Sequence, residues 1–87
     1  MNTFVNAMPA VHPGEFLRET LDEMALTPLA FAESIGVSYM HVSDLLTGSR
    51  PVTAELALQL GWKLGQTQQY WLNLQIAYDQ KVVLSPL

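Results

Sequence analysis

The chain of 87 residues contains no cysteine, which excludes a disulfide framework and a metal site built on thiolates. No apolar run approaches the roughly 20 residues that a membrane-spanning helix requires, so no membrane partner is expected. The first eleven residues, Met1 to Val11, also lack the basic flank of a secretory signal. Together these absences predict a cytoplasmic protein.

Positive charge is also scarce. Eight acidic residues stand against four basic ones, which gives a net charge of −4 at pH 7. Proteins that bind nucleic acid usually carry a basic surface, whereas an acidic protein is better suited to a basic partner. The lack of bases is most evident between Leu26 and Leu46, where there is no Lys or Arg at all.

The residues that are present predict a single all-α domain. Nearly half of them are apolar, so one ordered core is expected, and no segment alternates with period two for long enough to indicate a sheet. Five helices are expected, the first opening at Pro13. The residues expected to cap the other four are Thr27, Ser38, Thr53 and Thr67, and glycines that end helices are expected at Gly36, Gly48 and Gly65.

Each expected helix has an apolar stripe at helical spacing. The residues expected to face the core are Leu17, Leu21 and Met24; Phe31, Ala32 and Ile35; Val42, Leu45 and Leu46; Leu56, Leu60 and Leu64; and Trp71, Leu74 and Tyr78. The last helix carries a second stripe, formed by Leu72 and Ile76.

Two of these helices meet in a short turn at Ile35–Ser38. Helix, tight turn and helix is the arrangement by which many small proteins place one helix in the major groove of DNA. About 100° per residue puts one set of side chains on the outward face of the second helix. This face comprises Met40, Ser43, Asp44 and Thr47, flanked by Tyr39 and His41.

Several short motifs follow one another in a fixed order along most of the chain. They are His12-Pro13-Gly14-Glu15, Gly36-Val37-Ser38, Gly48-Ser49-Arg50, Thr53-Ala54-Glu55, and Trp71-Leu72-Asn73-Leu74-Gln75 with Tyr78-Asp79. In this order they resemble the HigA-type antitoxins, also called the VapI group, of the larger Xre/Cro helix-turn-helix family. The resemblance implies a five-helix domain over residues 12–79, with an N-terminal arm at 1–11 and a short apolar tail at 80–87.

The resemblance also implies a function. Such proteins are homodimers that bind an operator upstream of their own operon and repress it, and they neutralise a small basic toxin, a RelE-like ribonuclease that cleaves mRNA on the ribosome. The family's base contacts fall on Tyr39, Met40, Ser43 and Asp44, and its phosphate contacts fall near Ser38, Thr47, Ser49 and Arg50. His41 borders this set and is either a further phosphate contact, when protonated, or a plain surface histidine.

Three positions depart from the family's pattern, and each loses a positive charge or a donor. Pro28 stands where a Gln is frequent, Asp44 where Arg or Gln is frequent, and Trp62 where a base is frequent. We therefore expect DNA binding with little electrostatic drive, with a slope of log affinity against log salt of about −2 to −4 for a dimer. The alternative is a protein-interaction module on a helix-turn-helix fold whose DNA binding is weak or lost.

Individual side chains on this face have two interpretations each. Arg50 is either a phosphate clamp or a solvated loop charge. Asp44 either accepts from a cytosine amino group or repels the DNA backbone, and the second is favoured. Tyr39 and Met40 either contact thymine methyl groups or form a protein-binding patch.

Protein interfaces are expected elsewhere on the chain, for a second copy or for a toxin. The candidates are Trp62, Leu72 and Ile76, and ordinary burial in the core is the alternative for each. Gly61, beside Trp62, costs about 1 kcal/mol relative to alanine in a helix interior. That cost is understandable if another backbone approaches closely there.

No catalytic or metal-binding constellation is evident. Acidic side chains gather on the first helix, where a solvated face is the simplest interpretation; they are Glu15, Glu19, Asp22 and Glu23. His12 and His41 are far apart, and neither has a second ligand at metal-binding spacing. His12 is expected at the entry to the first helix. The protein is therefore expected to be no enzyme and to need no cofactor.

Overall fold

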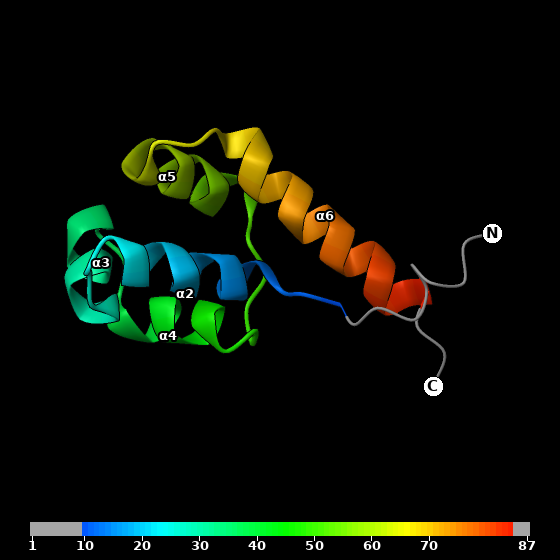
Figure 1. Ribbon diagram of the computed structural model, residues 1–87, viewed down its shortest axis with the longest axis horizontal. Helices are drawn as coiled ribbons and strands as arrows, with labels where there is room; N and C mark the ends of the chain where they lie inside the picture. Colours follow the sequence, from blue (N-terminus) through cyan, green and yellow to red (C-terminus); the bar gives the residue numbers. More distant parts are fainter. Residues whose placement is uncertain (1–9, 85–87) are drawn as a thin grey trace.

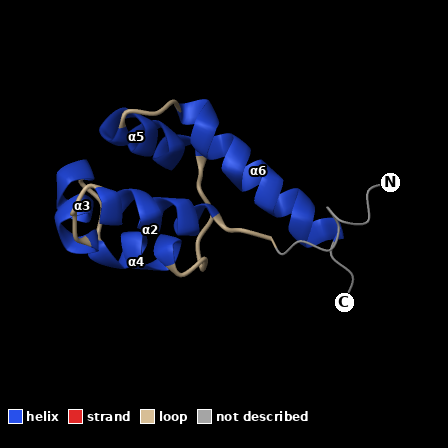
Figure 2. Cartoon of the chain, viewed as in Figure 1, coloured by secondary structure: helices blue, strands red, loops and turns tan. Residues whose placement is uncertain are grey.

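The computed structural model describes residues 10–84, which contain five helices and no strand. This confirms the all-α prediction, and Figure 2 shows helices joined only by loops and turns. The helices are α2 (Pro13–Glu23), α3 (Pro28–Ile35), α4 (Tyr39–Leu46), α5 (Ala54–Leu64) and α6 (Gln68–Leu84). No helix within residues 10–84 is long and apolar enough to cross a membrane.

The helices form two packed groups. Helix α4 packs against α2 and α3, α5 packs mainly against α6, and α6 also contacts α2. Figure 1 shows α2, α3 and α4 close together, with α6 running diagonally away from the other helices toward its C-terminal end. The first four helices are short, so their stability depends on packing rather than on intrinsic helix propensity.

The predicted caps are all present. The four hydroxyl caps each accept a hydrogen bond from the backbone N–H three residues later. These bonds join Thr27 to Ala30 (3.1 Å), Ser38 to His41 (3.1 Å), Thr53 to Leu56 (3.2 Å) and Thr67 to Tyr70 (3.0 Å). Gly36 and Gly65 end α3 and α5 in the left-handed conformation, at φ 74° and 77°, which glycine adopts without steric cost.

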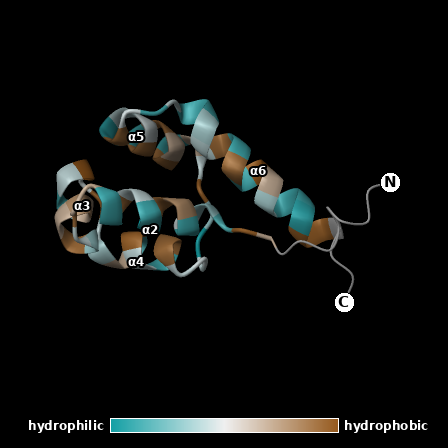
Figure 3. Cartoon of the chain, viewed as in Figure 1, coloured by the Kyte–Doolittle hydropathy of each residue, from teal (hydrophilic) through white to brown (hydrophobic). Residues whose placement is uncertain are grey.

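The core lies where the predicted stripes meet. It consists of Leu17, Leu21, Phe31, Ala32, Val42, Leu45, Leu46, Val52, Leu56, Ala57, Leu60 and Trp71. Trp71 is completely buried, and its indole N–H donates to Gln66 Oε1 at 2.8 Å, so its one polar atom is satisfied. Figure 3 shows apolar and polar residues alternating along the helices, as expected where each helix buries one face.

The prediction that Met24 faces the core is wrong. Helix α2 ends at Glu23, and Ala25 turns the chain with a φ of 56°. Met24 is therefore the C-cap of the helix rather than part of its stripe, and its side chain is 46% exposed. The turn places Leu26 against the core instead.

The last helix is longer than the sequence indicates. Helix α6 runs to Leu84, so residues 80–84 of the segment expected to be an apolar tail are helical. Val82 and Val83 lie on this extension and are exposed. Residues 1–9 of the expected arm and 85–87 of the expected tail lie outside the described part of the chain.

Candidate nucleic-acid interface

The predicted helix-turn-helix is formed by α3 and α4. Gly36 allows the chain to reverse direction, and the Val37 N–H donates to the Ala32 carbonyl at 3.1 Å across the turn. Phe31 and Val42 are buried where the two helices pack. Since these contacts fix α3 against α4, α4 presents its opposite face outward as a rigid surface.

The outward face of α4 carries the side chains that were predicted to read bases. Tyr39 is 50% exposed and Met40 is 64% exposed, whereas His41, Ser43 and Asp44 are half-buried. This surface has apolar area, a hydroxyl and a carboxylate, but no positive charge of its own. Any attraction to phosphate must therefore come from residues beside α4.

The loop after α4 folds back onto the helix in a Schellman turn. Gly48 has a φ of 80°, its N–H donates to the Leu45 carbonyl at 3.2 Å, and the Ser49 N–H donates to the Asp44 carbonyl at 2.8 Å. The hydroxyl groups of Thr47 and Ser49 also lie 3.0 Å apart. The turn thus holds two exposed hydroxyls at the end of the candidate recognition helix.

The same turn brings Arg50 back beside α4, where it meets Asp44. Arg50 Nη2 lies 3.6 Å from Asp44 Oδ2, and both side chains are partly exposed. It is the one ion pair within residues 10–84. A spacing of six residues does not predict this pair, because the contact depends on the turn between the two residues.

A second base, which no sequence pattern predicted there, lies near this end of α4. Arg18, on α2, places Nη2 3.5 Å from the carbonyl of Leu46, in the last turn of α4. A cation is favourable beside the carbonyls at a helix C-terminus. Arg18 is therefore a second base near the C-terminal end of α4, and helical periodicity does not predict this contact between α2 and α4.

His12 lies beside the turn at Gly48 that follows α4. As expected, His12 lies at the entry to α2, where its Nδ1 accepts from the Gly14 N–H at 2.9 Å. Its ring also packs edge-on against Tyr78 of α6, with 4.9 Å between ring centroids. Burial lowers the pKa of His12, and the backbone of Arg50 and the charges of Asp79 and Glu15 oppose this shift.

Gly14 explains another part of the first motif. A Cβ atom at this position would overlap the carbonyl of Leu45, so only glycine lets α2 approach α4 this closely.

No group of three or more His, Cys, Asp or Glu side chains that could hold a metal ion occurs in residues 10–84.

The loop that carries Arg50 is also tied to α6 by a buried amide. The Val52 N–H donates to Gln75 Oε1 at 2.7 Å, and Gln75 Nε2 donates to Asp79 Oδ1 at 2.8 Å. Gln75 is the buried polar residue among the described positions. Gln75, with Asp79 as its second partner, therefore holds the segment between α4 and α5 in place, and both residues belong to the motifs that carry the family resemblance.

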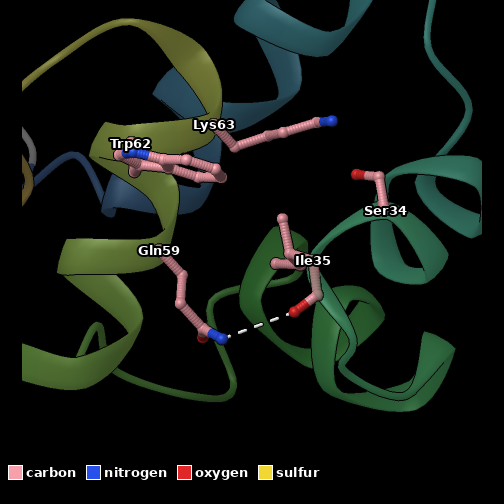
Figure 4. Close-up of a pocket in the computed structure, with 5 residues that line it drawn as sticks. All are labelled: Ser34, Ile35, Gln59, Trp62 and Lys63. Atoms are coloured by element: carbon pink, nitrogen blue, oxygen red, sulfur yellow. Dashed lines mark hydrogen bonds between the residues drawn. The ribbon is translucent and has the colours of Figure 1, made fainter.

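A different surface surrounds Trp62 on α5. Trp62 is 86% exposed and Leu58 is 57% exposed, so the alternative that Trp62 is buried in the core does not hold. Figure 4 shows the Trp62 ring above a shallow pocket between α5 and the end of α3. The pocket has a volume of about 180 Å³ and is lined by Ser34, Ile35, Gln59, Trp62 and Lys63.

The other interface candidates differ from Trp62. Leu72 is half-buried and packs against the core, whereas Ile76 is 49% exposed. The interpretation of Gly61 is confirmed: a Cβ there would lie 2.6 Å from the carbonyl carbon of Thr67 and 2.8 Å from the carbonyl oxygen of Gln66. The backbone that approaches Gly61 is thus the turn between α5 and α6.

Comparison with known proteins identifies the family, although no family model matches the chain. The chain is 44% identical over 78 residues to virulence-associated protein I of Dichelobacter nodosus, covering 88% of this chain and 72% of that protein. The fold is similar to that of a HigA-family addiction module antidote protein from Coxiella burnetii, with a TM-score of 0.86 and 38% identity over 88% of this chain and 85% of that one.

A further solved structure is that of Pseudomonas aeruginosa antitoxin HigA with the higBA promoter. It has a TM-score of 0.82 and 36% identity, covering 85% of this chain and 82% of that one. The order of the motifs, the five-helix fold and these similarities agree. The chain therefore belongs to the HigA family of helix-turn-helix antitoxins, which are not enzymes.

Proposed function

We propose that the protein is an antitoxin-type autorepressor that binds operator DNA upstream of its own gene through α4 and the loop that ends at Arg50. The observation that carries this proposal is the outward face of α4, whose residues Tyr39 and Met40 are exposed. The similarity to the HigA structure with its promoter supports the same use of the fold.

The arrangement suits a division of work between bases and phosphates. Tyr39, Met40 and Ser43 present apolar area and a hydroxyl that contact base edges and thymine methyl groups in the major groove. Thr47, Ser49 and Arg50 at the end of α4 contact phosphates, which set the position of the helix without reading sequence. Ser38 and His41 flank the base contacts.

The electrostatic contribution is small in this proposal. Arg50 and Arg18 neutralise at most about two phosphates per protomer, so a dimer has a salt slope near −4, using about −0.9 per phosphate. Binding therefore relies more on shape and hydrogen bonds than it does in a basic helix-turn-helix protein.

A regulator of its own operator acts where the chromosome lies, so the proposed function implies a cytoplasmic protein.

The proposal includes two protein partners. Helix-turn-helix proteins commonly bind paired half-sites as dimers, and the exposed Trp62 face is the proposed contact between two copies. Figure 1 shows α2 between α5 and α4 in this view, and in this proposal the contact between two copies leaves α4 free. The net charge of −4 suits a small basic toxin as the second partner. We propose that this toxin is a RelE-like ribonuclease. The exposed Ile76 and the half-buried Leu72 are candidates for the contact with it.

The test of DNA binding is gel retardation with a duplex from the region upstream of the gene and a scrambled duplex of equal composition. The upstream duplex is expected to bind at least tenfold more tightly, and salt is expected to weaken binding. Tyr39→Ala and Arg50→Ala should each weaken this binding, while Gln80→Ala, an exposed residue on α6, serves as the matched control. Equal, weak binding of both duplexes at low salt rejects the repressor role.

The toxin is tested separately by co-expression with the product of the neighbouring reading frame. A small basic protein that co-purifies with this chain, and whose mRNA cleavage the chain inhibits, supports the antitoxin role. If partner capture persists in Tyr39→Ala and Arg50→Ala, which have lost DNA binding, the two surfaces are independent. If the wild-type protein captures a partner but binds no operator, the chain is instead a protein-interaction module on a helix-turn-helix fold.

A further inference from the structure

The ion pair between Asp44 and Arg50 is fixed by the backbone as well as by charge. The carbonyl of Asp44 accepts from the Ser49 N–H at 2.8 Å, and this bond closes the turn that returns Arg50 to the helix. The segment beyond Arg50 is held by the hydrogen bond from the Val52 N–H to Gln75 Oε1. The two side chains therefore remain within reach of each other, at 3.6 Å.

This pairing changes what Arg50 contributes to DNA binding. A phosphate that attracts Arg50 must compete with the carboxylate of Asp44, which already lies beside it. When Arg50 leaves, Asp44 becomes an unpaired negative charge beside the phosphates, which repel it. On an arbitrary sequence the gain from Arg50 is therefore largely offset by the exposure of Asp44.

One kind of base removes this penalty. In the major groove a carboxylate accepts a hydrogen bond from the N4 amino group of cytosine. A cytosine opposite Asp44 thus replaces Arg50 as its partner, and Arg50 becomes available for the adjacent phosphate. Both charges then have partners, and this happens only where the base pair supplies the amino group.

We propose that Asp44 is a specificity-determining residue, which holds Arg50 away from phosphates until a cytosine amino group takes its place. This inference rests on the proposed function and adds the base that the site reads. It also explains how one carboxylate on the candidate recognition helix is compatible with DNA binding. Removing it should strengthen binding to unrelated DNA rather than abolish binding.

The first test compares wild type, Asp44→Ala, Arg50→Ala and the double variant on the scrambled duplex over a range of salt. Asp44→Ala is expected to bind the scrambled duplex about threefold to thirtyfold more tightly. The reason is that Arg50 no longer has to leave Asp44 to reach a phosphate, and each of the two exposed ion pairs per dimer is a weak contact. The salt slope should steepen by about 2, since two phosphates gain a partner. In the Arg50→Ala background the same substitution should leave the slope within about 0.5 of its value.

A charge control separates this mechanism from general repulsion. Glu33→Ala removes an exposed carboxylate from α3 and should leave the slope for scrambled DNA unchanged. If Asp44→Ala steepens the slope equally with and without Arg50, Asp44 simply repels the DNA backbone and the inference is wrong. Thermal unfolding of each variant confirms that differences in binding do not come from loss of fold.

The second test replaces each G·C pair of the upstream duplex in turn with A·T. The wild-type protein should lose at least tenfold in affinity at one G·C pair per half-site, and Asp44→Ala should be indifferent to that replacement. If both proteins respond identically at every position, Asp44 reads no base and the inference fails while the repressor role stands. If the wild type cannot distinguish the upstream duplex from the scrambled one, the proposed function itself fails.

Discussion

Gln75 shows how a single buried amide supports the candidate DNA-binding loop. Its Oε1 accepts from the Val52 N–H at 2.7 Å in a buried setting, and no described residue leaves a buried side-chain polar atom unpaired. The loop after α4 contains Arg50 and Pro51 and needs such an anchor because it has no regular hydrogen-bonded structure of its own.

Gln75→Ala should therefore destabilise the protein by about 1–3 kcal/mol, since the Val52 N–H is left buried without an acceptor. The free energy of unfolding in urea measures this loss. Gln80→Ala, an exposed residue on the same helix, should change it by less than about 0.5 kcal/mol. An equally mild effect of both substitutions would contradict the role assigned to Gln75.

His12 gives a prediction about pH. Its pKa is lowered chiefly by burial, so the unfolded chain binds a proton more readily than the folded chain between the folded pKa and the ordinary value of 6.5. Stability is therefore full above about pH 6.5 and declines as the pH falls from there through the folded pKa. Protonation also occupies Nδ1, the atom that accepts from the Gly14 N–H.

The variant His12→Asn keeps a side-chain acceptor at the cap of α2 but does not titrate in this range. Its free energy of unfolding should change less between pH 7.5 and 5.5 than that of the wild type. Acidic groups that titrate lower affect both proteins, so the difference between the two profiles isolates His12. Parallel profiles would show that His12 makes no contribution to pH dependence.

At the scale of the elements, the close contact between α5 and the turn before α6 depends on Gly61. The nearest atoms to an added Cβ belong to the backbone of Gln66 and Thr67, so they move only if the two helices move apart. Alanine is otherwise the better helix former by about 1 kcal/mol.

We expect Gly61→Ala to lower the free energy of unfolding by about 1–3 kcal/mol, because overpacking outweighs the gain in helix propensity. Chemical denaturation measures this change. Stabilisation by about 1 kcal/mol would instead show that the turn yields easily and that propensity alone decides.

The elements also show which sequence signals were reliable. Thr27, Ser38 and Thr53 cap helices where predicted, because a hydroxyl cap acts on an N–H only three residues away. Met24 was placed wrongly because its spacing fits the stripe of α2, while the end of that helix depends on the left-handed turn at Ala25. An alanine in that conformation is uncommon, and no local pattern indicates it.

At the scale of the whole molecule, Trp62 is the most exposed of the large apolar residues described. An exposed tryptophan beside a shallow pocket is the kind of residue that dominates protein interfaces. In the proposed dimer, its position on α5 leaves the α4 face accessible.

Trp62→Ser should therefore shift the protein from dimer toward monomer, with a change in unfolding free energy of the isolated chain within about 0.5 kcal/mol. Sedimentation over a range of concentrations measures the dimer equilibrium. Leu29→Ser, which alters an exposed apolar residue on α3, is the matched control and should leave the equilibrium unchanged. Identical dimerisation of both variants would assign Trp62 to another partner.

The amino-acid sequence by itself determined the fold class, the five helices with most of their ends, the greater part of the core, and the family. These features follow from caps, glycines and apolar spacing, all of which act within a few residues along the chain. Only the tertiary structure decided that Trp62 is exposed, that Arg18 reaches the end of α4, and that Asp44 faces Arg50. Contacts of this kind join different elements or cross a turn, so they depend on how the helices pack and not on local spacing.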